Sequence, residues 1–151
     1  MRQIPASRQE LERQNTSQLL RIPYQLFIER LFTRLTEVGF TGIHPAHATV
    51  FQHVATDGIR VTDLARRSQL TKQYVGRLVA DLEGQGFLER AEDPSDGRAK
   101  LVRLSSRGQE LTRAAEEIIT EIEADWARRV GQPRHTELRR ALVDLILSLE
   151  K

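Results

Sequence analysis

The chain has 151 residues, which suits one ordinary domain or a small domain with an added oligomerisation arm. It has no cysteine, which excludes disulfides, thiolate metal sites and a cysteine nucleophile, and no apolar run reaches the roughly 18 residues of a membrane span. The net charge of +2 is too small to indicate nucleic acid by itself, but between residues 60 and 77 five basic residues stand against Asp63 alone. We expect a cytoplasmic protein without a membrane or secretory segment.

Two helices are predicted at the start of the chain. Ser7 and Glu10 match a capping box, which predicts a short helix. Pro23 lacks a backbone N–H and disfavours a helical residue before it, so the next helix is predicted over about residues 22 to 38, with Gly39 as its end. Pro45 suits the first turn of a further short helix.

Two short helices joined by a tight turn are predicted in the middle of the chain. Thr62 is the predicted cap of the first helix, and Thr71 is the predicted cap of the second. The second helix ends at Gly84 and Gly86. Its predicted buried positions recur at helical spacing and are Val75, Leu78, Val79 and Leu82.

A β-hairpin and two further helices are predicted after this pair. Residues 87–91 and 101–104 are rich in β-forming side chains, and residues 92–100 read as a long loop between them. Ser105 is the predicted cap of a long helix, Gly131 and Pro133 break it, and Thr136 is the predicted cap of the last helix.

The order of these elements predicts the fold. Residues 59–61 are a brief β-prone stretch before the helix pair. A helix, this short strand, a helix, a turn, a helix and a two-stranded hairpin form the winged helix-turn-helix arrangement, in which the second helix of the pair fits the DNA major groove. The predicted fold is therefore mostly α, with a two-stranded β-wing.

The second helix of the pair is predicted to read DNA through its outer face. With the apolar stripe buried, the polar residues of its N-terminal half point outward, where Gln pairs with adenine and Arg with guanine. The first helix crosses the phosphate backbone, so its arginines are predicted phosphate contacts, with an ordinary solvated face as the alternative. For Tyr74, packing against the wing is the alternative. The predicted DNA contacts of these helices are Arg66, Arg67, Thr71, Lys72, Gln73, Tyr74 and Arg77.

The hairpin is predicted to supply a second groove contact. Arg98 and Lys100 are the basic residues near its tip, and arginine is favoured in a narrow minor groove because the negative potential is deepest there. Asp93 and Asp96 have two interpretations: they hold the guanidinium of Arg98 in position, or they only initiate the turn.

Residues 61–108 resemble the DNA-binding core of the MarR (multiple antibiotic resistance regulator) family. The resemblance rests on VTDLARRSQLTKQYVGRLVADLEGQGFLERAEDPSDGRAKLVRLSSRG, with the wing signature D-P-x-D-x-R-A and the following L-S-S-R-G. It implies that Arg98 is the wing arginine, and that the chain is a homodimer binding two half-sites of double-stranded DNA as a ligand-responsive repressor. The implied organisation is N-terminal dimerisation helices over residues 1–44, a winged helix domain over 45–105 and C-terminal dimerisation helices over 106–151.

The same resemblance implies a binding site for a small aromatic or lipophilic effector. This pocket is expected around Phe32, His47, Phe51 and Tyr74. A second apolar group has two interpretations, a ligand cavity or, as is more usual for this spacing, core or dimer interface; it consists of Ile118, Ile119, Ile122 and Trp126. His44, His47 and His53 are interpreted as caps or helix-surface residues in preference to metal ligands, because no carboxylate cluster accompanies them.

Other classes of function remain as alternatives. The chain has no G-x-S-x-G, phosphate-binding glycine loop or H-E-x-x-H motif, so we predict neither an enzyme nor a cofactor. A winged helix that contacts an acidic protein partner is one alternative, and a small-molecule binding protein without DNA affinity is another. Steep loss of affinity with salt on duplex DNA separates the DNA-binding reading from both.

Overall fold

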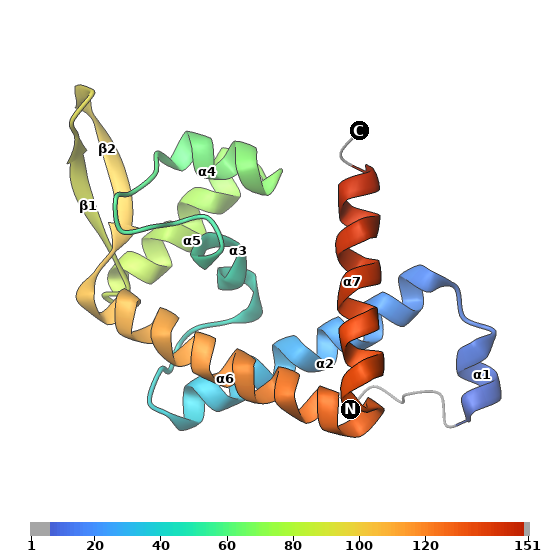
Figure 1. The fold of residues 1–151 in the computed structure, drawn as a ribbon. Helices are drawn as coiled ribbons and strands as arrows, with labels where there is room; N and C mark the ends of the chain where they lie inside the picture. The colour runs from blue at the N-terminus through green and yellow to red at the C-terminus, as the bar shows by residue number, and fades with distance from the viewer. Residues whose placement is uncertain (1–6, 150–151) are drawn as a thin grey trace. The chain divides into compact units, whose positions relative to one another are not determined.

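The computed structural model describes residues 7–149, apart from the side chain of Arg98. The chain forms two compact units, one up to Ala115 and one from Glu116, and the division falls inside a long helix. No helix within residues 7–149 is long and apolar enough to cross a membrane. The elements, in chain order, are α1 (Arg8–Glu12), α2 (Thr16–Glu37), the 3₁₀ helix η1 (Pro45–His47), α3 (Ala48–Phe51), α4 (Val61–Ser68), α5 (Lys72–Gly84), β1 (Leu88–Asp93), β2 (Asp96–Leu104), α6 (Ser106–Val130) and α7 (Gln132–Leu149) (Figure 1).

The helix-turn-helix forms as the pattern predicts. The side chain of Thr71 accepts a hydrogen bond from the backbone N–H of Tyr74, which caps α5. The four predicted apolar positions of α5 are all buried, together with Leu64 and Ala65 of α4. α4 and α5 therefore pack against each other through an apolar face, and the opposite face of α5 is free for other contacts.

The start of α2 differs from the prediction. The helix begins at Thr16 with Asn15 as its cap, and it runs through Pro23 without a restart. Pro23 has no N–H to donate to the carbonyl of Leu19, so the helix loses a single hydrogen bond at this point. Pro23 and Leu19 are both exposed, and water can therefore bind the free carbonyl. Gly39, with a φ of 99°, lies just beyond the end of the helix as predicted.

Two other predicted caps are also wrong. Thr62 lies inside α4, because Ile59 is paired to Val102 and the helix starts directly after Arg60. Thr136 lies inside α7, which starts at Gln132. Pro133 fits in the first turn of α7, because backbone N–H groups in a first turn make no hydrogen bond within the helix. Both threonines therefore have no capping role.

The wing is paired closer to its tip than predicted. β1 and β2 are antiparallel, and the register runs from Leu88 opposite Leu104 to Asp93 opposite Asp96, with an irregularity next to Asp93. The predicted long loop is therefore a turn of two residues. An isolated bridge between Ile59 and Val102 adds a short third segment to the sheet.

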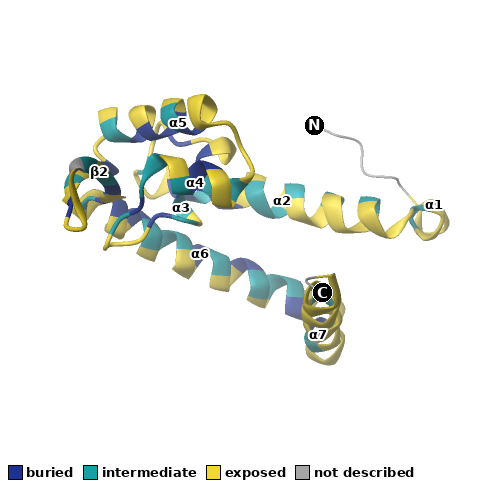
Figure 2. Ribbon diagram, turned by 90° about the horizontal axis from the view of Figure 1, so that it is seen from above, coloured by how far each residue is buried: buried dark blue, intermediate teal, exposed yellow. Residues whose placement is uncertain are grey.

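The second unit consists of the C-terminal half of α6 with α7. Ile118, Ile122 and His135 are buried. At the other end of α6, in the first unit, the N–H of Gly108 donates to the hydroxyl of Ser105, which confirms the predicted cap. α7 is exposed along most of its length, as the yellow colour of its ribbon in Figure 2 shows. Its exposed apolar residues are Leu138, Val143, Leu145, Ile146, Leu147 and Leu149. An open pocket of about 1070 Å³ lies between the two helices within this unit, and Ile119 lines it.

Candidate nucleic-acid interface

The N-terminal half of α5 presents polar and basic side chains to solvent. Lys72, Gln73, Tyr74 and Arg77 are all exposed, because the helix buries its opposite, apolar face. The guanidinium of Arg77 lies 5.7 Å from the ring centroid of Tyr74, within the range of a cation–π contact. The structure therefore brings the predicted base-reading residues together on one surface.

The two arginines at the end of α4 are also exposed. Arg66 pairs with Asp63 one turn earlier at 2.8 Å, and 76% of its side chain is exposed. Surface pairs of this kind are weak, so a phosphate group would replace the carboxylate at little cost. Arg66 and Arg67 lie in the last turn of α4, where positive charge interacts favourably with the negative end of the helix dipole.

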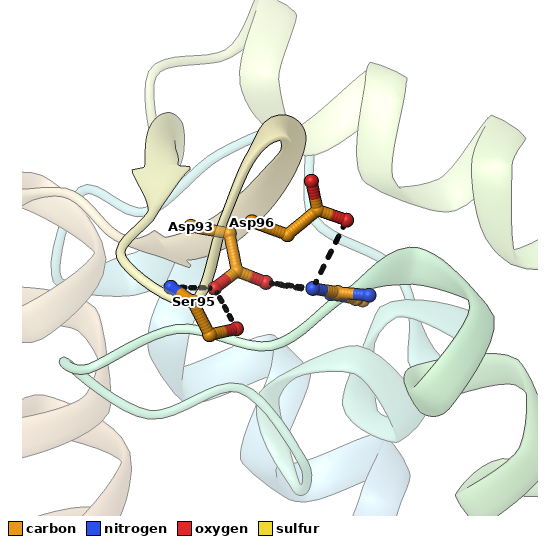
Figure 3. A network of polar contacts seen from close by, with 4 residues as sticks. Asp93, Ser95 and Asp96 are labelled. Atoms are coloured by element: carbon orange, nitrogen blue, oxygen red, sulfur yellow. Dashed lines mark hydrogen bonds and ion pairs between the residues drawn. The ribbon is translucent and has the colours of Figure 1, made fainter.

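The wing tip is organised by a carboxylate and an arginine from another element. Asp93 accepts hydrogen bonds from the backbone N–H and the hydroxyl of Ser95, at 2.8 and 2.6 Å. Its other oxygen accepts from Nε of Arg60 at 2.6 Å, and Figure 3 shows Asp93 and Asp96 converging on that guanidinium. The two bonds from Ser95, followed by the one from Arg60, lower the pKa of Asp93 to about 2.

These contacts confirm that Asp93 initiates the turn, because it accepts from the backbone N–H of Ser95. They also give Asp93 a partner that the sequence did not predict, Arg60. Arg98 lies in β2 at the wing tip, and its side chain is outside the part of the chain that the structure describes. Lys100 lies opposite Glu92 in the hairpin at 3.6 Å.

One further ion pair joins the wing to α5, and another lies within the wing. Arg90 of β1 binds Glu83 of α5 through two hydrogen bonds, at 2.7 and 3.1 Å. Arg103 pairs with Glu89 across the hairpin at 2.7 Å. The wing is thus attached to α5 at its base and to the start of α4 at its tip.

His47, one of the predicted effector residues, is buried beside the helix-turn-helix. Its Nδ1 accepts from the backbone N–H of His44 at 3.0 Å, and its Nε2 lies 2.9 Å from a carboxylate oxygen of Asp81. Burial lowers the pKa of His47, and the opposing effect of Asp81 is smaller. His47 thus links η1 to α5 and caps the turn at His44, in keeping with the interpretation of these histidines as caps.

The aromatic residues predicted for the effector pocket have different surroundings. Phe32 and Phe51 are half-buried, and Tyr74 is exposed on α5. Phe51 packs edge-on against Phe87 with ring centroids 6.4 Å apart. The rings of Phe32 and Phe51 therefore keep part of their surface accessible, whereas both nitrogens of His47 are engaged.

Comparison with known proteins places this arrangement in a family. The family model described as MarR family matches residues 41–99, which contain the helix-turn-helix and most of the wing. Over these residues the chain matches the MarR family. An HTH-type transcriptional repressor of Mycobacterium tuberculosis is 30% identical over 88 residues, which are 58% of this chain and 63% of the repressor. An uncharacterised HTH-type regulator of Bacillus subtilis is 33% identical over 59% of this chain and 62% of its own.

Solved structures share the MarR fold over most of the chain. A transcriptional regulator from Thermotoga maritima has a TM-score of 0.63 at 23% identity, over 89% of this chain and 93% of its own. The S. aureus MepR–DNA complex has a TM-score of 0.66 at 22% identity, over 89% and 98%. The fold therefore extends beyond the sequence match, which spans less than two thirds of the curated relatives.

Proposed function

We propose that this MarR family chain is a sequence-specific DNA-binding transcription regulator that represses its targets as a homodimer. The observation that carries the proposal is the outer face of α5, where Lys72, Gln73, Tyr74 and Arg77 are exposed on a helix capped by Thr71 and backed by a buried apolar stripe. Gln and Arg side chains on such a helix recognise base edges in the major groove. The names of the mycobacterial repressor and of the MepR–DNA complex support the same function.

The mechanism assigns a role to each part of the first unit. α5 lies in the major groove, Arg66 and Arg67 bind phosphates from the end of α4, and the wing brings Arg98 and Lys100 to the adjacent minor groove. Dimerisation through the terminal helices, over residues 1–44 and 106–151, places two copies of α5 on half-sites about one helical turn apart. The exposed apolar side chains of α7 support this role, since exposed apolar surface favours association.

We also propose that a small aromatic or lipophilic ligand releases the repressor from DNA. Support comes from the partly accessible rings of Phe32 and Phe51 and from the S. aureus MepR structure, which is bound to ethidium bromide. Tyr74 and His47 would connect such a ligand to α5, because Tyr74 lies on α5 and His47 contacts Asp81 of the same helix. If planar aromatic ligands at millimolar concentration change neither the melting temperature nor the DNA affinity, this extension is refuted.

The experiment that tests the function is selection of duplexes from a random pool by the purified protein, followed by titration of the selected duplex at two salt concentrations. A pseudo-palindrome with half-sites about 10 base pairs apart, bound more weakly at high salt, is the expected result. Absence of enrichment at every salt concentration would refute DNA reading and favour a winged helix that binds a protein partner.

A further inference from the structure

Arg60 occupies the capping position of α4 without capping it. Its backbone has the extended conformation of a cap residue, but its side chain makes no capping bond. The guanidinium instead reaches the wing tip, where Nε and Nη2 lie 2.6 and 2.5 Å from the same oxygen of Asp93, and Nη2 lies 3.6 Å from Asp96. Side chains at this position that cap a helix are short, so the arginine serves another purpose.

The partner of Arg60 is the residue that shapes the tip. One oxygen of Asp93 accepts both bonds from Ser95, which define the turn, and the other oxygen binds Arg60 (Figure 3). Asp93 is 7% exposed and Arg60 is 37% exposed, so the pair is partly shielded from solvent. The geometry of the turn and the start of α4 are therefore joined through a single carboxylate.

The backbone beside Arg60 is held as well. Ile59 exchanges two hydrogen bonds of 2.9 Å with Val102 in β2. The segment that carries Arg60 is thus attached to the middle of the wing, and its side chain is attached to the tip. An isolated two-stranded hairpin is only marginally stable in water, so attachment at two points restricts where the tip lies.

We propose that Arg60 is a positioning residue for the wing, which holds the tip at a set place relative to α5 so that the wing reaches the groove beside the one that α5 occupies. This inference rests on the proposed DNA-binding function. Its physical basis is pre-organisation, because a tip that is ordered before binding loses less conformational freedom on the DNA.

Charge at the tip strengthens the argument. The tip carries three carboxylates, Glu92, Asp93 and Asp96, against the two cations Arg98 and Lys100. Phosphate groups repel an excess of negative charge. A cation that binds two of these carboxylates therefore makes it easier for the wing tip to approach DNA. Arg60 supplies this charge without projecting from the wing itself.

Arg103 offers a matched control. It pairs with Glu89 at 2.7 Å, and its side chain is 46% exposed, so Arg103→Gln removes the same charge and a similar ion pair from the same hairpin. Arg103 and Glu89 both belong to the hairpin, however, and their pair does not join the wing to α4. If the two variants behave differently, the cause is therefore the lost connection between the wing and the start of α4, because both variants lose the same charge.

The first test needs no DNA. Amide hydrogen exchange at residues 93–100 is measured for the wild type, Arg60→Gln, Arg60→Lys and Arg103→Gln in the full chain, with circular dichroism to check folding. We expect faster exchange at the tip in Arg60→Gln, about tenfold, with no change in Arg103→Gln. Arg60→Lys, which keeps the charge but offers a single donor group, should show an intermediate rate. If the tip of Arg60→Gln exchanges its amide hydrogens at the same rate as the tip of the wild type, the proposal is overturned.

The second test is a double-mutant cycle with Arg98→Ala on the duplex that the wild type selects. We expect Arg60→Gln to weaken binding about tenfold in the wild-type background and to add nothing in the Arg98→Ala background, since both changes remove the same wing contact. Additive losses, or equal losses for Arg60→Gln and Arg103→Gln, would overturn the positioning role. A wild type that binds no duplex refutes the proposed function itself, and the exchange measurement still decides whether Arg60 fixes the tip.

Discussion

Replacing Gly108 by alanine should destabilise the protein, although the same change inside a helix is normally stabilising. Gly108 is buried in the first turn of α6, and its N–H donates to the hydroxyl of Ser105. A Cβ added here would overlap the carbonyl oxygen of Phe87 and lie 3.3 Å from the side chain of Leu104. Phe87 is fully buried, and its carbonyl also accepts from the N–H of Ser105, so neither neighbour has room to move.

The expected magnitude follows from three opposing effects. Helix propensity favours alanine over glycine by about 1 kcal/mol. Overpacking against a rigid neighbour costs about 1 to 3 kcal/mol, and weakening the bond between Ser105 and Phe87 costs about 1 kcal/mol more. The net expectation is a loss of about 1 to 3 kcal/mol in the free energy of unfolding.

Gly76→Ala provides the matched control for this measurement. Gly76 lies in the interior of α5, and a Cβ added there meets no atom within 4 Å, so the substitution should stabilise the fold by about 0.5 to 1 kcal/mol. Urea unfolding of both variants and the wild type at one protein concentration gives the comparison, because association makes apparent stability depend on concentration. A Gly108→Ala variant at least as stable as the wild type would refute the reasoning.

Three further predictions concern the site. Thr71→Ala should lower the free energy of unfolding by about 1 kcal/mol because it removes the cap of α5, whereas Thr62→Ala, a change inside α4, should not; equal effects in urea unfolding would contradict the assignment. Arg67→Gln should lower the slope of log affinity against log salt by about 1 in fluorescence anisotropy, and an unchanged slope would remove Arg67 from the phosphate contacts. Because the folded-state pKa of His47 lies below its ordinary value of 6.5, the unfolded state takes up the proton first, so stability should fall as the pH drops below about 6.5; His47→Gln should flatten this dependence, and an unaltered pH profile would speak against the buried neutral histidine.

Local signals in the sequence were sufficient for the parts of the fold that depend on neighbouring residues. The buried stripe of α5, its cap at Thr71 and the glycines at 39 and 131 act within a few residues of themselves, and each was predicted correctly. The order of the elements then predicted the winged helix-turn-helix. The same periodicity placed the exposed polar face of α5, since burying one side of a helix defines the other.

Only the three-dimensional structure showed where contacts with distant segments, or solvent exposure, override a local sequence signal. Pro23 was read as a helix boundary, but α2 continues because only one exposed bond is lost. The residues before Thr62 pair with β2, and this pairing moved the start of α4.

The contacts that organise the candidate site also depend on long-range folding. Arg60 was visible in the sequence as one of five clustered basic residues, yet its partner Asp93 lies 33 positions away and was interpreted as initiating the turn or as holding Arg98. A charge pattern shows which side chains are available for pairing. Only the fold brings a particular donor within hydrogen-bond distance of a particular acceptor, because directional contacts require a geometry that sequence spacing does not specify.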